Sequence, residues 1–144
     1  MGTRLGHVGL AAKDPGALAA FYARFLGLTR VAEVTTEQTG PMVLLSTQPG
    51  AAPDVQLLSN PEARHVAFRV DTLGELRERH AAAAQSGARV LFAFDHGATL
   101  SFYALDPEGN ACEVYWETGR RPSATNRPVD LARTEDEILA ELGN

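Results

Sequence analysis

An internal duplication constrains the fold of this 144-residue chain more than any other feature. The segments His7-Val8-Gly9-Leu10 and His65-Val66-Ala67-Phe68 are similar, and each opens a half that reads as a strand, a helix and three further strands. We therefore predict one α+β domain of two βαβββ repeats, over about residues 4–60 and 63–118, with curled mixed sheets.

Capping signals support the two predicted helices. Asp14-Pro15 is a typical helix start and Gly27 a typical end, while Thr72 with Glu75 forms a capping box and Gly87 ends the second helix. The predicted strands cover 4–12, 28–36, 42–46 and 55–58 in the first half, and 64–71, 88–94, 100–105 and 111–116 in the second.

The last two of these strands form a hairpin around the turn 106–110, which contains Pro107 and Gly109. If Leu105 pairs with Ala111, Tyr103 lies directly opposite Glu113 on one face of the sheet. A carboxylate on a sheet that otherwise buries apolar side chains needs a partner, because an isolated buried charge is costly. A metal ion is the partner that we expect.

The residues after 118 differ from the repeats. We assign residues 1–118 to the domain and 119–144 to a C-terminal arm, irregular over 120–128, followed by a short helix. Thr134 and Glu137 predict a second capping box at the start of that helix. The sequence does not decide whether the helix docks on the domain or on a second subunit of a homodimer.

Two histidines in matching places of the repeats, together with Glu113, make a candidate metal-ligand set. His7 and His65 each lie near the start of a repeat on the same predicted strand face. Two imidazoles and one carboxylate on one side of a metal leave open positions, as in non-haem Fe(II) sites. The alternative is that His7 and His65 are core histidines bonded to the backbone. Gln56 is the first-half counterpart of Glu113, and it is a candidate fourth ligand or substrate contact.

Composition excludes other classes of function. The net charge is −5 and no run of Lys or Arg occurs, which argues against nucleic acid as a partner. One cysteine excludes an internal disulfide, and no apolar stretch reaches membrane-spanning length or resembles a leader. We expect a cytoplasmic protein without a membrane segment.

The duplicated halves with His7, His65 and Glu113 resemble the vicinal oxygen chelate superfamily, which contains glyoxalases, bleomycin-resistance proteins, epimerases and dioxygenases. Within it, the run from His96 through Phe102-Tyr103 and Asp106-Pro107-Glu108-Gly109 to Glu113 resembles the type I extradiol dioxygenase signature. His96 and Tyr103 are the discriminating pair, because the Asp-Pro-x-Gly part recurs across the superfamily. Phe94 departs from the signature, which usually has a small, polar or β-branched residue there.

The resemblance implies that His7, His65 and Glu113 hold Fe(II), or Mn(II) in some members. A catechol would bind through its two oxygens together with O₂, and His96 and Tyr103 would be the catalytic residues. An imidazole suits this role because its pKa lies near neutrality. The family commonly has a further acid–base histidine before the second ligand, and residues 48–64 contain none.

The resemblance predicts a dioxygenase of aromatic catabolism that cleaves the ring of a small catecholic substrate. One alternative is a glyoxalase- or epimerase-type isomerase or lyase, which would use Zn, Ni or Co with Gln56 as fourth ligand. Another is a non-catalytic resistance protein that sequesters a small molecule.

Overall fold

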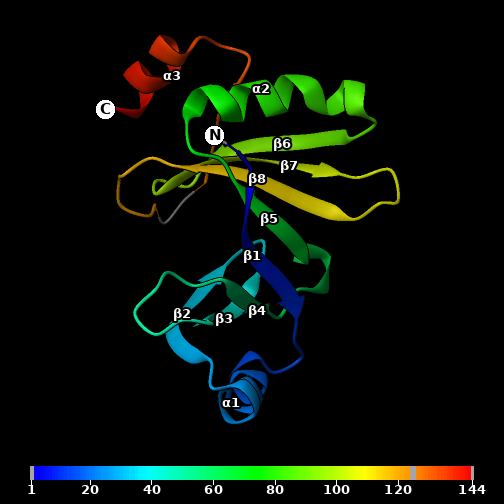
Figure 1. Ribbon diagram of the computed structural model, residues 1–144, viewed down its shortest axis with the longest axis vertical. Helices are drawn as coiled ribbons and strands as arrows, with labels where there is room; N and C mark the ends of the chain where they lie inside the picture. The colour runs from blue at the N-terminus through cyan, green and yellow to red at the C-terminus, as the bar shows by residue number, and fades with distance from the viewer. Residues whose placement is uncertain (1, 124–125, 144) are drawn as a thin grey trace. The chain divides into compact units, whose positions relative to one another are not determined.

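The order strand, helix and three strands occurs twice in the computed structural model, which describes residues 2–123 and 126–143 (Figure 1). This order confirms the predicted βαβββ duplication. The described elements are β1 (Arg4–Ala11), α1 (Pro15–Leu26), β2 (Thr29–Thr36), β3 (Gly40–Ser46), β4 (Val55–Leu58), a 3₁₀ turn (Pro61–Ala63), β5 (His65–Arg69), α2 (Leu73–Ala83), a second 3₁₀ turn (Ala84–Ser86), β6 (Arg89–Asp95), β7 (Thr99–Leu105), β8 (Ala111–Glu117), β9 (Arg127–Pro128) and α3 (Glu135–Leu142).

The nine strands of the described residues belong to one mixed sheet, with the order β2-β3-β4-β1-β5-β8-β7-β6-β9. The strands β1 and β4 run parallel, while β2–β3, β3–β4, β6–β7 and β7–β8 are antiparallel pairs. The order is open, with β2 and β9 at its ends, and the sheet is not curled. The expectation of curled sheets was therefore wrong.

The chain divides into two compact units, of which one comprises Gly6–Val66 and the other the residues on either side of it. The assignment of residues 1–118 to one domain stays a prediction. No helix of the described residues has both the length and the apolarity that a membrane crossing requires.

In the Gly6–Val66 unit, α1 covers one face of the strands. The buried Ala19 packs in a cluster with Val43, Leu45 and Leu57. The Asp14 side chain accepts from the Ala17 N–H, and Gly27 ends α1 in the left-handed conformation, so both predicted caps are confirmed. The face of β1 and β4 opposite this cluster carries His7, Gly9 and Gln56.

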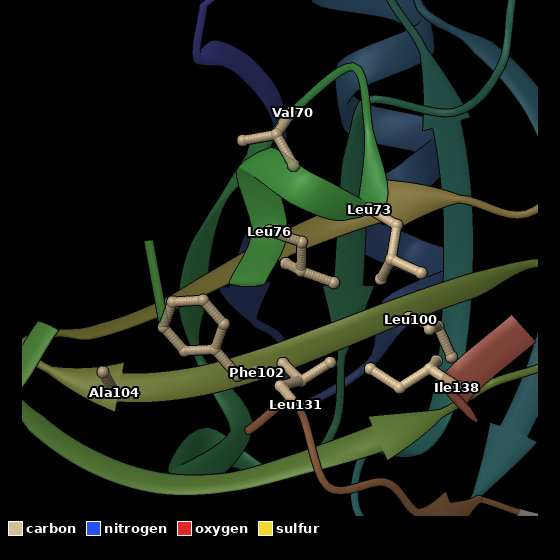
Figure 2. Packing of buried hydrophobic residues seen from close by; sticks show 8 residues of the cluster. All are labelled: Val70, Leu73, Leu76, Leu100, Phe102, Ala104, Leu131 and Ile138. Atoms are coloured by element: carbon tan, nitrogen blue, oxygen red, sulfur yellow. The ribbon is translucent and has the colours of Figure 1, made fainter. Parts of the chain in front are cut away.

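In the other unit, α2 lies along β6, β7 and β8 (Figure 1), over a core that Figure 2 shows from close by. Leu76 of α2, Phe102 of β7 and Ile138 of α3 all belong to this core. Cys112, Val114 and Trp116 of β8 also pack against this cluster. The other face of β7 and β8 carries Tyr103 and Glu113.

A β-bulge occurs at the same point of both repeats. The register of β2 with β3 shifts between Arg30 and Ala32, and that of β6 with β7 shifts between Val90 and Phe92. An extra residue reverses the faces of the side chains that follow it. As a result, Val90 pairs with the core residue Ala104, while Phe92 pairs with Tyr103 on the opposite face.

The C-terminal arm is more ordered than predicted. Arg127–Pro128 forms the short strand β9, which pairs with the end of β6, so the prediction of an irregular arm over 120–128 was wrong at its end. Residues 124–125 of that range lie outside the described residues. Arm and sheet pair here because β6 is otherwise an edge strand whose backbone groups need partners.

The short helix α3 docks on its own unit, through the buried Ile138. Thr134 caps it by accepting from the Glu137 N–H, as predicted. The second half of the predicted capping box is not formed, because the Glu137 carboxylate instead accepts from Arg133.

Candidate metal centre

His7 and His65 face each other in the Gly6–Val66 unit. His7 lies on β1 and His65 is the first residue of β5, and their Nε2 atoms are 3.0 Å apart. The rings meet edge to face, with an interplanar angle of 88°. Two ligand nitrogens at about 2.1 Å from one metal, at right angles, would lie about 3.0 Å apart. The two nitrogens are within hydrogen-bonding distance of each other, and the same spacing fits a shared metal ion.

A backbone hydrogen bond fixes the orientation of His65. Its Nδ1 lies 2.7 Å from the carbonyl oxygen of Ala63, which can only accept, so Nδ1 carries the proton. In the neutral ring Nε2 is then the unprotonated nitrogen, which carries the lone pair that a metal ligand requires and which lies 3.0 Å from Nε2 of His7. His65 thus bonds to the backbone through Nδ1, while its Nε2 is directed toward His7.

Glycine at position 9 makes room for the His65 ring. A Cβ atom on Gly9 would lie 2.9 Å from Nδ1 of His65 and 3.1 Å from Cδ2 of Leu58. Real side chains do not tolerate such contacts, so any larger residue at this position would displace the ring. Gly9 was not recognised as a site residue from the sequence.

Glu113 is buried in the other unit, with only 5% of its surface exposed. It lies on β8 directly opposite Tyr103 on β7, and Leu105 pairs with Ala111, so the predicted register is confirmed. Burial, and next the negative charge of Glu113, raises the pKa of Tyr103 far above its usual value. The phenol therefore keeps its proton.

His7, His65 and Glu113 form a group that could hold a divalent metal. Each offers one ligand atom, an imidazole nitrogen from each histidine of the Gly6–Val66 unit and a carboxylate oxygen from Glu113 of the other unit. Two imidazole nitrogens and a carboxylate oxygen suit Fe(II), Mn(II) and Zn(II) alike, so the donor set does not select the metal.

Gln56 lies on the sheet face that carries His7. Its Cα pairs with Gly9 of β1 and with Leu44 of β3, and neither pairing has a register shift at this point. Because residues paired in register project to the same face, its amide lies on the side of the histidines. Its role as a fourth ligand or substrate contact stays a prediction.

The two predicted catalytic residues are neighbours. Nε2 of His96 lies 3.1 Å from the hydroxyl oxygen of Tyr103, and Nδ1 of His96 lies 2.7 Å from Oδ1 of Asn126. Asn126 was missed in the sequence, where an asparagine in a proline-containing arm gives no signal of a site. Only the fold brings it to His96.

Aromatic rings adjoin this pair. Phe92 and Phe94 project from β6 on the face of Tyr103, with ring centroids 4.9 Å apart. The Phe94 ring lies 5.9 Å from that of His96, and the Phe92 ring lies 5.0 Å from that of Tyr103. Phe92 is 46% exposed, so the cluster presents an accessible apolar surface.

The fold and these residues define a class of protein, the duplicated βαβββ proteins with a His/His/carboxylate group suited to a divalent metal. Residues 4–114 match the family model described as the Glyoxalase/Bleomycin resistance protein/Dioxygenase superfamily. The chain belongs to this superfamily.

One curated relative matches most of this chain. Biphenyl-2,3-diol 1,2-dioxygenase 3 of Rhodococcus globerulus is 29% identical over 117 residues, which cover 77% of this chain and 62% of that protein. This chain thus spans less than two thirds of that relative.

Solved structures with the same fold include two different enzymes. The 2,3-dioxygenase LapB from Pseudomonas sp. KL28 has a TM-score of 0.65 at 17% identity, covering 88% of this chain and 46% of that one. The methylmalonyl-CoA epimerase of Mycobacterium tuberculosis has a TM-score of 0.62 at 24% identity, covering 79% of this chain and 87% of that one. These likenesses establish the fold alone.

Proposed function

We propose that this protein is a metal-dependent, extradiol-type dioxygenase that cleaves the ring of a small catecholic substrate with O₂. The observation that carries the proposal is the imidazole of His96 beside the phenol of Tyr103, which itself lies opposite the buried Glu113. Proton-transfer groups next to a ligand of a metal are what the cleavage of a diol substrate needs.

His7, His65 and Glu113 would hold the metal, with Fe(II) as our first choice. When bound, Fe(II) would supply positive charge that stabilises the two substrate oxygens, and redox chemistry with O₂. The 3.0 Å spacing of the two Nε2 atoms and the fixed tautomer of His65 support this assignment. Mn(II) is an alternative with the same donor set.

His96 and Tyr103 would handle the protons of the substrate. His96 takes the proton of a diol hydroxyl on Nε2, which is the ring nitrogen nearest to Tyr103. Tyr103 stays protonated, because burial and Glu113 raise its pKa, and it can donate a hydrogen bond to a substrate oxygen. This pair would also serve in place of the missing histidine upstream of His65.

The aromatic neighbours of the pair support an aromatic substrate. Phe92 and Phe94 present rings beside His96 and Tyr103, and a planar ring packs well against such faces.

Oxygen consumption tests the proposal directly. The chain is loaded with Fe(II) without air, mixed with catechol or 2,3-dihydroxybiphenyl, and followed with an oxygen electrode and by the yellow colour of the ring-opened product. Glu113→Ala should abolish both signals. Glu108→Ala, which changes an exposed carboxylate in the turn before β8, should leave them intact. Absence of oxygen uptake by the Fe(II)-loaded wild-type chain across the catechol series would overturn the proposal.

A second candidate is an isomerase or epimerase, which the position of Gln56 favours. Its amide is on the face of His7, so His7, Gln56, His65 and Glu113 could form a four-ligand set for Zn, Ni or Co. Oxygen-independent turnover of a thiohemiacetal or an acyl-CoA epimer, lost in Gln56→Ala, would favour this reaction. Tight binding of a planar ligand by metal-free protein, without turnover, would instead favour sequestration.

A further inference from the structure

The segment after β8 is bonded directly to the loop that carries His96. The Ser123 N–H donates to the carbonyl of His96 at 2.8 Å, and the Thr118 hydroxyl donates to the carbonyl of Gly97 at 2.6 Å. Arg120 pairs with the Asp95 carboxylate, which also accepts from the Gly97 N–H. These contacts hold both sides of the His96 loop.

Gly97 allows this close approach. It has a φ of +82°, and a Cβ there would lie 2.5 Å from the Ser123 nitrogen and 2.9 Å from the Pro122 carbonyl carbon. A side chain at position 97 would push the arm away, so the loop and the arm fit each other only with glycine at this point.

The arm also contacts the ring of His96, through the side chain of Asn126. Oδ1 of Asn126 lies 2.7 Å from Nδ1, on the opposite side of the ring from Nε2, which lies 3.1 Å from the Tyr103 hydroxyl. An amide oxygen can only accept, so Nδ1 must carry a proton when it faces this atom. The other nitrogen is then the one that changes its protonation state.

We propose that Asn126 is a positioning residue that keeps Nδ1 of His96 protonated, so that the ring gains and loses its proton only at Nε2. This inference rests on the proposed function for its role in the reaction. In the neutral ring, Nε2 accepts from the Tyr103 hydroxyl or from a diol hydroxyl of the substrate. After the proton moves from the diol to Nε2, the imidazolium donates to Tyr103 and still donates through Nδ1 to Asn126.

The Tyr103 hydroxyl has a single proton, so the group to which it donates depends on the protonation state of His96. When Nε2–H donates to the Tyr103 oxygen, the Tyr103 hydroxyl can donate to Glu113, with which it shares a hydrogen bond. Asn126 would therefore contribute to catalysis through His96, because it supplies the acceptor that directs the reactive nitrogen of His96 toward the substrate.

The decisive measurement is the tautomer of His96 in the 144-residue chain, read from the ¹⁵N shifts and couplings of the imidazole at a pH where the ring is neutral. We expect the Nδ1–H form in the wild type, a shift toward mixed tautomers in Asn126→Leu, and the Nδ1–H form again in Asn126→Asp, which keeps an acceptor oxygen. Asn126→Ala replaces the leucine variant if that one does not fold. An Nε2–H ring in the wild type, or an unchanged tautomer in the variants without an acceptor, would overturn the proposal.

Kinetics give the second measurement. Asn126→Leu should lower kcat for catechol cleavage about 10-fold or more with KM within about 3-fold, and Asn126→Asp should recover most of it. Arg121→Ala, in an exposed residue of the same arm, is the matched control and should change neither value. If the wild type cleaves no catechol, the proposed reaction fails, but the tautomer measurement still decides the role of Asn126.

Discussion

The ring of His65 lies against Gly9 in space that a side chain at position 9 would fill, since a Cβ on Gly9 would lie 2.9 Å from Nδ1 of His65. The same Nδ1 atom donates to the Ala63 carbonyl at 2.7 Å. The ring is therefore confined on its Nδ1 side by two neighbours, one of which is a backbone atom. This confinement directs Nε2 toward His7.

The first prediction concerns Gly9→Ala. The added methyl group must displace the His65 ring and break its bond to Ala63, so we expect the affinity for Mn(II) or Zn(II) to fall about 10- to 100-fold, as for other losses of a partner that orients a ligand. Isothermal titration calorimetry on metal-stripped protein measures this change. Gly16→Ala, whose Cβ would meet only Asp14 at 3.6 Å, is the control and should bind metal like the wild type. Equal affinities of Gly9→Ala and the wild type would contradict the contact.

The second prediction concerns Tyr103→Phe. This variant keeps the ring that packs on Phe92 but removes the hydroxyl between His96 and Glu113. Because a positioned proton-transfer group contributes about 10²-fold or more, we expect kcat to fall by about that factor while metal binding is retained. Steady-state oxygen uptake and a metal titration together check it. A variant with full kcat would show that the phenol takes no part in the reaction.

Local signals predicted those parts of the fold and site that depend on neighbouring residues. The caps at Asp14 and Thr72 have the predicted hydrogen bonds, because a cap involves residues three positions apart. The register that pairs Tyr103 with Glu113 followed from the turn between β7 and β8, whose length fixes every pair beyond it.

Features that depend on long-range packing were not predictable in this way. The bulge before Phe92 leaves no signal in the alternation of β6, yet it decides which face the two phenylalanines occupy. Asn126 reaches His96 only because the arm pairs with β6 and closes over Gly97. Gly9 is needed because of a ring that is distant in the sequence, and no local pattern distinguishes such a glycine from any other in a strand.

The third prediction concerns substrate size. The Phe94 ring lies 5.9 Å from that of His96 and 6.5 Å from that of Tyr103, so it occupies space beside the proposed catalytic pair. Phe94→Val should raise kcat/KM for bulky 3-substituted catechols relative to catechol itself, by about 10-fold if one aromatic contact decides the preference. A panel of catechols of increasing size measures this ratio. Leu91→Val, at the exposed bulge of the same strand, should leave it unchanged.

The fourth prediction concerns His80 and the pH dependence of stability. The His80 ring packs edge-on against Phe102 at 5.1 Å, and burial lowers its pKa below the usual 6.5, although Asp130 opposes the shift. Below pH 6.5 the unfolded chain therefore takes up a proton at His80 before the folded chain does. Folding should lose stability as the pH falls from about 6.5 toward the lowered pKa, and the loss should level off below it.

Urea unfolding of metal-stripped wild type and His80→Gln, at pH values from 7.5 to 5, tests whether His80 lowers the free energy of unfolding as the pH falls. Glutamine does not titrate, so the variant should lose less stability than the wild type over the same range, whatever its stability at pH 7.5. The other three histidines are present in both proteins and cancel in the comparison. Parallel curves for the two proteins would mean that His80 titrates alike in the folded and unfolded chains, and that its contact with Phe102 leaves the imidazole as hydrated as in the unfolded chain.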